Sequence, residues 1–253
     1  MQKKPMIRLN RTLLSFLWGG SRGGTLGPMP PFDYADAPVP VRSGIADAHR
    51  AFWQRMAGPG ARFTGEQRVA MAREARAARA VRTEPPWLRG LPEPEPGVLP
   101  VEAIRAIRTL SLDQHEIDRD WANGMIESLA DDVAYVELVA IAVQTIAVDT
   151  FAEAIGVEPE PLPEPVAGAP DGTRPEGLGD IGAFVPATLE FSGPNVARAL
   201  SLAPAENATF FGLVASMYAM ADFGELVWKD RPLTRPQVEL VAARVSAINE
   251  CFY

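Results

Sequence analysis

The side chains most capable of covalent chemistry are scarce in this sequence, which contains one cysteine, Cys251, and two histidines, His49 and His115. A thiolate is a nucleophile, but one cysteine excludes an internal disulfide and a zinc site made of cysteines alone. A lone cysteine is by itself more often a small buried residue. His115 precedes three carboxylates within five residues, a pattern expected to be a solvated face rather than a metal site. His49 is expected on an amphipathic surface.

The composition is that of an ordinary soluble protein. Of the 253 residues, 47% are apolar and 22% are charged, and the net charge is −8. The negative charge argues against a broad nucleic-acid-binding surface, because each neutralised phosphate needs a cation. Apolar runs are too short to span a membrane, and the apolar stretch 13–18 is shorter than an export signal requires. We expect a cytoplasmic protein with no nucleic-acid or membrane partner.

Two proline-rich tracts interrupt the chain. Residues 84–100 are expected to run extended over the surface, because proline lacks the N–H that a helix interior needs. Residues 158–175 are acidic and free of aromatic side chains, which is typical of a semi-rigid linker. We therefore predict a flexible arm (1–40), a first helical unit (41–157), a linker (158–180) and a second helical unit (181–253). The alternative for the second tract is a long loop within one domain.

The apolar residues between these tracts recur with helical spacing, which predicts an all-α fold. Thr64 and Gln67 form a capping box that begins an arginine- and alanine-rich helix, whose charged face is expected to be solvated. A helix that begins at Asp131 or Asp132 and ends at Gly156 is apolar on nearly every side. Such a helix is expected to be central and buried.

Two more helices are expected in the last third of the chain. One begins at Pro204, in the first turn where proline is tolerated. The other begins at a second capping box, Thr234 to Gln237, and carries one apolar stripe. The stripe consists of Val238, Val241, Val245, Ile248 and Phe252. A further group is expected to form a core rather than a cofactor site: Phe52, Trp53, Met56 and Phe63.

A short segment of the sequence occurs twice. Residues 137–140, ELVA, recur 102 residues later as 239–242. The same offset pairs Val143 with Val245, Ile146 with Ile248, and Phe151 with Tyr253. The repetition favours an internal duplication, although apolar helices of similar composition can align by chance.

The final segment, LTRPQVELVAARVSAINECFY, resembles the core motif of the alkylhydroperoxidase D and carboxymuconolactone decarboxylase superfamily. In that motif a glutamate is followed at a fixed distance by N-x-C-x-Y/H-C and then by a histidine. Glu239, Asn249, Cys251 and Tyr253 fall on it. The rest of the chain resembles, more weakly, the two-copy members of the superfamily. The resemblance implies an all-α bundle of two tandem related units, the second incomplete because the second cysteine would follow Tyr253.

The resemblance also implies a peroxidase-like thiol oxidoreductase. It would reduce hydroperoxides with a thiol or dithiol reductant, as a homo-oligomer and without a metal or other cofactor. Cys251 matches the first cysteine of the family's pair, usually the resolving one, and Glu239 matches the carboxylate that relays a proton. With one thiol we expect oxidation but little turnover. Asp149 takes the place of Cys251 in the first copy, which is therefore expected to be a structural half.

Proton transfer between Glu239 and Cys251 depends on the shape of the last helix. Twelve residues of unbroken α-helix would separate Glu239 from Cys251 by about 18 Å and by about 120° of rotation. A relay therefore requires the helix to break, and we expect the break near residues 247–249. Without a break, Glu239 is a first-turn acid near the positive end of the helix.

Two other functions stay open. The chain could be a noncatalytic helical interaction protein whose apolar ends dock a partner chain. It could also be a lactone decarboxylase-type enzyme, which would use acid–base residues instead of thiols, but the sequence holds no clustered His/Glu pair to supply them.

Overall fold

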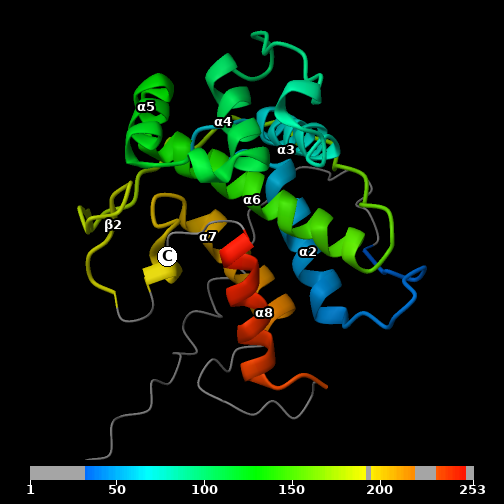
Figure 1. The fold of residues 1–253 in the computed structure, drawn as a ribbon. Helices are drawn as coiled ribbons and strands as arrows, with labels where there is room; N and C mark the ends of the chain where they lie inside the picture. The colour runs from blue at the N-terminus through cyan, green and yellow to red at the C-terminus, as the bar shows by residue number, and fades with distance from the viewer. Residues whose placement is uncertain (1–31, 192–194, 220–231, 249–253) are drawn as a thin grey trace, which may run out of the picture.

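The computed structural model of the chain describes residues 32–191, 195–219 and 232–248. Within these ranges the protein is mostly helical and its one sheet has two short strands, which confirms the all-α class (Figure 1). The bundle type and the two tandem units stay predictions. The α-helices are α2 (Ser43–Ala57), α3 (Gly65–Ala80), α4 (Val101–Leu112), α5 (Arg119–Leu129), α6 (Asp132–Ala154), α7 (Pro204–Val214) and α8 (Arg235–Ile248). The shorter elements are η2 (Pro86–Leu88), η3 (Gln114–Glu116), β1 (Leu178–Gly179), β2 (Ala187–Thr188), η4 (Asn195–Arg198) and η5 (Ala215–Ala219).

Helix α6 is the centre of the helical body, and α2, α3, α4, α5 and α7 all pack against it (Figure 1). Asp131 caps its first turn, because its carboxylate accepts hydrogen bonds from the backbone N–H groups of Val133 and Ala134. Just beyond its last turn, Gly156 adopts the left-handed conformation with φ +75°. The central position and both ends of this helix are thus as predicted. Contrary to the sequence-based expectation, its length and apolarity would suffice to cross a membrane, but most of it is buried inside the protein.

The main core forms where α2, α3, α4 and α6 meet. The four residues predicted to form a core do so: Phe52, Trp53 and Met56 are fully buried and Phe63 nearly so. The capping box of α3 also forms, with the Thr64 hydroxyl accepting from the Gln67 backbone and the Gln67 side chain accepting from the Thr64 N–H. These contacts fix where α3 begins relative to α2.

The two proline-rich tracts lie on this helical body. Residues 84–100 contain no α-helix and only one short 3-10 turn, η2. The second tract is tied to α2 and to the loop after it, because the N–H of Val166 donates to the Ala57 carbonyl at 2.8 Å and that of Asp171 to the Gly60 carbonyl at 3.0 Å. Helix α7 follows in sequence and contributes Leu213 to the same core as α2 and α6. The described parts of both predicted units therefore share one core.

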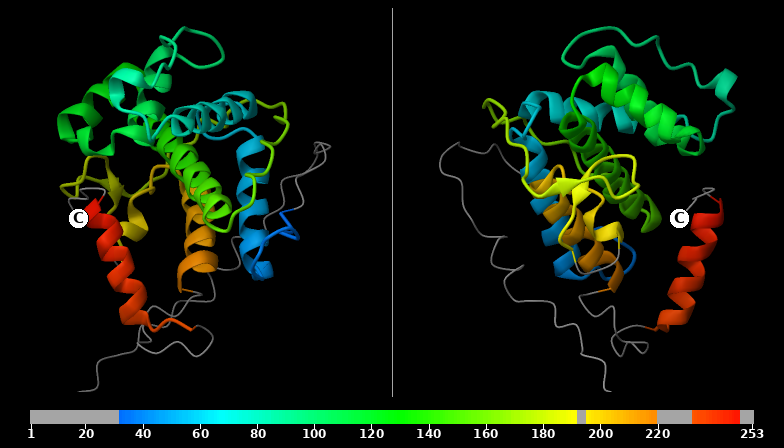
Figure 2. Two further views of the ribbon diagram at one scale, coloured as in Figure 1. Left: turned by 45° about the vertical axis from the view of Figure 1, so that its right-hand side comes forward. Right: turned by 90° about the vertical axis from the view of Figure 1, so that its left-hand side faces the viewer.

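Helix α7 leads into η5, one turn of π-helix, and α8 stands apart from the helical body (Figure 2). None of the described side chains of α8 is fully buried. Four apolar residues are exposed: Leu240, Val241, Val245 and Ile248. Of the stripe predicted from the sequence, Val241, Val245 and Ile248 face solvent and Val238 is half-buried. Phe252 lies outside the described residues.

Candidate functional site

The predicted relay residue Glu239 lies near the start of α8 and is held from two sides. Its carboxylate accepts a hydrogen bond from Arg235 Nε at 3.2 Å, one helical turn earlier. It also makes a side-chain hydrogen bond with Tyr218 of η5. Burial raises the pKa of the Tyr218 hydroxyl, and the hydrogen bond to Glu239 raises it further. The Glu239 side chain is 46% exposed, so its carboxylate is oriented and still accessible.

Asn249, Cys251 and Tyr253 lie outside the described residues. The helix break predicted near residues 247–249 and the approach of Glu239 to the Cys251 sulfur therefore stay predictions. Helix α8 extends through the described residues up to Ile248.

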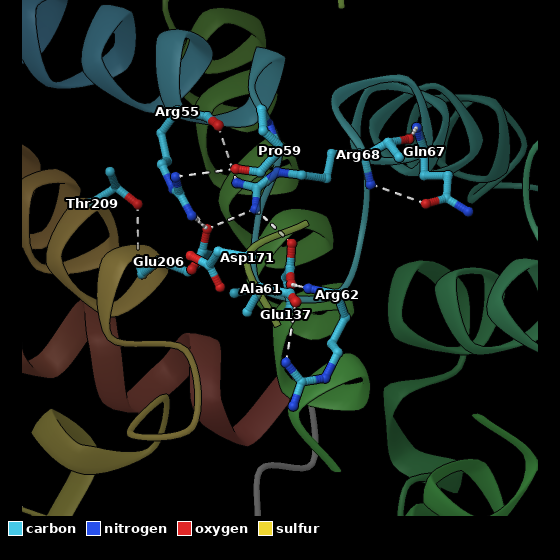
Figure 3. A network of polar contacts seen from close by, with 12 residues as sticks. Arg55, Pro59, Ala61, Arg62, Gln67, Arg68, Glu137, Asp171, Glu206 and Thr209 are labelled. Atoms are coloured by element: carbon cyan, nitrogen blue, oxygen red, sulfur yellow. Dashed lines mark hydrogen bonds and ion pairs between the residues drawn. The ribbon is translucent and has the colours of Figure 1, made fainter. Parts of the chain in front are cut away.

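The counterpart of Glu239 in the first repeat, Glu137, has a different environment. It is fully buried in α6, where its carboxylate accepts from Arg68 Nη1 at 2.6 Å and from the Arg62 backbone N–H at 2.8 Å (Figure 3). Arg68 Nη1 also donates to Glu206 at 2.7 Å. Arg55 Nε donates to the same Glu206 oxygen at 2.8 Å and closes the cluster. Two guanidinium groups thus balance two carboxylates, which is the condition for burying charge.

Four elements position this ion cluster. Arg68 lies shortly after the N-cap residue Thr64 of α3, and Glu137 lies in the second turn of α6. Glu206 lies in the first turn of α7. A glycine is required in the loop between α2 and α3, because a Cβ at Gly60 would overlap both the Glu137 carboxylate and the Arg68 guanidinium. The cluster therefore joins α2, α3, α6 and α7 at one point.

The electrostatics of the ion cluster depend on its burial. Desolvation raises the pKa of Glu137, and nearby Glu206 adds to the rise, while Arg68 opposes it. Because Arg68 and Glu137 are both inaccessible, no substrate can reach them in this conformation. The arrangement can hold helices together but cannot exchange protons with a bound molecule.

The first repeat also lacks the helix break that would bring its glutamate close to the position that corresponds to Cys251. Helix α6 continues unbroken from Asp132 to Ala154, so Glu137 and Asp149 lie about 18 Å apart along one helix. Asp149 occupies the position of Cys251 and forms a bidentate ion pair with Arg76, with both distances 2.7 Å. Each acid of the first repeat is thus committed to a separate structural contact.

The surface position predicted for His49 is wrong, because its side chain is fully buried. Tyr34 forms a hydrogen bond with its Nδ1, and Met217 Sδ lies 3.3 Å from its Nε2. The ring of Phe151 packs against it edge-on. Both polar contacts are satisfied when the neutral ring carries its proton on Nε2. Since Met217 precedes Tyr218, this contact connects α2 to the element that holds Glu239.

Several of these buried polar residues were not predicted from the sequence, although their positions in the apolar stripes were a signal. Arg68 was expected on a solvated face, yet it lies in the stripe of α3 that also contains Gly65, Ala72 and Ala75, all buried. His49 likewise follows Ile45 and precedes Phe52 and Met56 at helical spacing on the buried face of α2. A polar residue within such a stripe indicates a buried hydrogen-bond partner elsewhere in the chain.

Comparisons with known proteins found no matching family model, curated protein or solved structure. Among the described residues, no group of three or more His, Cys, Asp or Glu side chains is placed to hold a metal ion. His115 itself is exposed, as expected.

Replacing Arg68 with methionine leaves two buried carboxylates without their shared partner. We expect the free energy of unfolding to fall by about 3–5 kcal/mol, measured by urea denaturation. Arg73→Met is the matched control, because Arg73 is exposed on the same helix and its loss should change stability by less than about 0.5 kcal/mol. Equal effects of the two substitutions would contradict the role given to the ion cluster.

The stability of the protein should fall in acid because of His49. Burial lowers the pKa of its imidazole from 6.5 to about 4. Between these two pH values the unfolded chain binds a proton that the folded protein does not, so the free energy of unfolding decreases by up to about 3 kcal/mol as pH falls through this window. Above pH 7.5 His49 contributes no pH dependence.

Urea denaturation at a series of pH values measures this effect. The His49→Gln variant should lose the part of the slope between pH 6.5 and 4 that His49 contributes, while the part that comes from carboxyl groups remains. The His115→Gln variant should keep it, because His115 is exposed in the folded protein. A slope in His49→Gln equal to that of the unmodified protein would refute the assignment.

Proposed function

We propose that the chain is a thiol oxidoreductase of the alkylhydroperoxidase D type, with Cys251 as its thiol and Glu239 as the proton-relay carboxylate. The observation that supports this proposal is the environment of Glu239. Its repeat counterpart, Glu137, is sealed in an ion cluster, whereas Glu239 is partly exposed and is oriented by Arg235 and Tyr218. An oriented and accessible carboxylate is what proton transfer requires.

The proposed reaction begins with the Cys251 thiolate. The thiolate attacks one peroxide oxygen, the O–O bond breaks, and the leaving alkoxide takes a proton to become an alcohol, while the sulfur becomes a sulfenic acid. One external thiol then condenses with the sulfenic acid to give a mixed disulfide and water. A second external thiol releases Cys251. Glu239 accepts the proton of the Cys251 thiol, through water, once the chain beyond α8 bends toward it.

The proposed chemistry takes place in the cytoplasm and uses small-molecule substrates without a cofactor. A cytoplasmic location keeps the thiol reduced between reactions. The substrates are a hydroperoxide and a thiol or dithiol, and no metal or flavin takes part. Because the 253 residues contain one cysteine, resolution depends on an external thiol, and we propose that turnover is impaired.

Oxidation of Cys251 can be measured directly. After treatment with cumene hydroperoxide and dimedone, mass spectrometry should detect one sulfenic-acid adduct per chain, and none in Cys251→Ser. The Glu239→Gln variant should react at least about tenfold more slowly, because the relay carboxylate is lost. The matched control is Glu127→Gln, which alters an exposed acid on α5.

Three outcomes would contradict parts of the proposal. An unreactive Cys251 would refute the thiol chemistry. Equal rates for Glu239→Gln and the unmodified protein would refute the relay. Rapid, sustained hydroperoxide consumption with an external thiol, abolished by Cys251→Ser, would refute the impairment.

The exposed face of α8 favours a second candidate function, a noncatalytic helical interaction protein. Val241 and Ile248, on the apolar stripe of α8, are 59% and 63% exposed. Leu240, on another face of α8, is also exposed, whereas its repeat counterpart Leu138 is fully buried in α6. Neighbouring apolar side chains left in water favour association. We propose a second copy of the chain as the partner, which agrees with the homo-oligomer that the resemblance implies.

Sedimentation equilibrium can test this association. The unmodified protein should associate as its concentration rises, and the double variant Val241→Glu/Val245→Glu should stay monomeric because two charges interrupt the apolar stripe. Ala243→Glu adds a charge at an exposed position away from that stripe and should associate normally. A monomer at every concentration would reject this second function without affecting the thiol chemistry.

A further inference from the structure

A surface groove lies between α4 and α5, far in sequence from the thiol motif. Its volume is about 400 Å³, and its third wall is the proline-rich segment around Pro92 and Pro94. The volume is within the range of pockets that hold small organic molecules. Figure 1 shows α4 and α5 next to one another, with the proline-rich segment leading into α4.

The proline-rich wall is fixed before any ligand binds. Arg89 forms a bidentate ion pair with Asp113 at 2.7 and 3.0 Å. Arg108 of α4 donates to the Pro92 carbonyl at 2.6 Å and to Glu74 of α3 at 2.6 Å. Beyond the groove, Leu99 is buried in the main core. A ligand therefore meets a preorganised wall and needs to spend little of its binding free energy on ordering it.

The floor of the groove is apolar. Trp121 and Met125, one turn apart on α5, line it. Both side chains pack against the main core and against the smaller core around Val136 and Leu202, yet neither is fully buried. The Trp121 ring is further held by an edge contact with Tyr135, with ring centroids 6.3 Å apart. A rigid indole beside a thioether is a surface on which a flat apolar group can stack.

One wall of the groove carries a cation that is available to a ligand. Arg105 of α4 is exposed and lines the groove, and its guanidinium makes no hydrogen bond or ion pair with any residue that the structure describes. Arg108 also lines the groove but is occupied by Glu74 and Pro92. A guanidinium binds a carboxylate through two parallel N–H groups. Glu93, on the opposite wall, is the acid that faces the same space.

We propose that this groove binds a small-molecule carboxylate with a flat aromatic body. The carboxylate pairs with Arg105 and the ring stacks on Trp121 and Met125. Glu93 repels the anion and so limits its affinity. The site uses none of the residues of the thiol chemistry, so it stands independently of the proposed oxidoreductase function.

The test uses 1-naphthaleneacetate and its neutral analogue 1-naphthaleneacetamide as probes, with binding measured by isothermal titration calorimetry on the full chain. The acetate should bind at least about fivefold more tightly than the amide. Arg105→Gln should weaken acetate binding about tenfold and leave the amide unchanged. Glu93→Gln should strengthen acetate binding. Arg73→Gln, which removes an exposed cation on α3, is the charge-matched control and should change neither.

The result has clear alternatives. No binding of 1-naphthaleneacetate at millimolar concentration would overturn the proposal. So would equal affinity for acetate and amide, or an Arg105→Gln effect no larger than that of Arg73→Gln. Because Arg105 is exposed, its substitution leaves the core intact, and circular dichroism of each variant verifies the fold.

Discussion

The packing of α2, α3, α6 and α7 depends on one buried ionic contact, the guanidinium of Arg68 between the carboxylates of Glu137 and Glu206. It joins α3 to α6 and α7, and the contacts of Arg55 bring in α2. Burying these charges is unfavourable unless all are present and correctly placed. The cluster therefore selects one packing of four helices, whereas apolar contacts among alanine-rich surfaces would allow several.

This constraint also explains the difference between the two repeats. In the first, the glutamate is part of a neutral, closed cluster and most of α6 is buried. In the second, Arg235 and Tyr218 orient the glutamate near solvent, and α8 keeps its apolar stripe exposed. The same short sequence thus serves packing in one place and offers an accessible carboxylate in the other, because its neighbours differ.

The sequence predicted the features that depend on residues close together in the chain. The capping box at Thr64, the cap at Asp131 and the glycine at 156 each act within a few residues, and all are observed. The contacts of Arg68 span 69 and 138 residues, and periodicity alone could not identify such distant partners. For the same reason the sequence left open whether the second proline-rich tract separates two units or is a loop within one domain, and it could not identify the residues that join α7 to the core of the first unit. Glu239 was identified as a candidate from its motif, but its partner Tyr218 was not.

The proline-rich wall has a consequence for peptide recognition. Extended chains often recruit a neighbour by β-augmentation, in which alternate N–H groups along one edge pair with the carbonyls of an added strand. Pro92, Pro94 and Pro96 alternate in this segment, so the edge they share has no N–H group to offer. The proline-rich wall therefore cannot pair along that edge with another copy of the protein to form a fibril-like sheet.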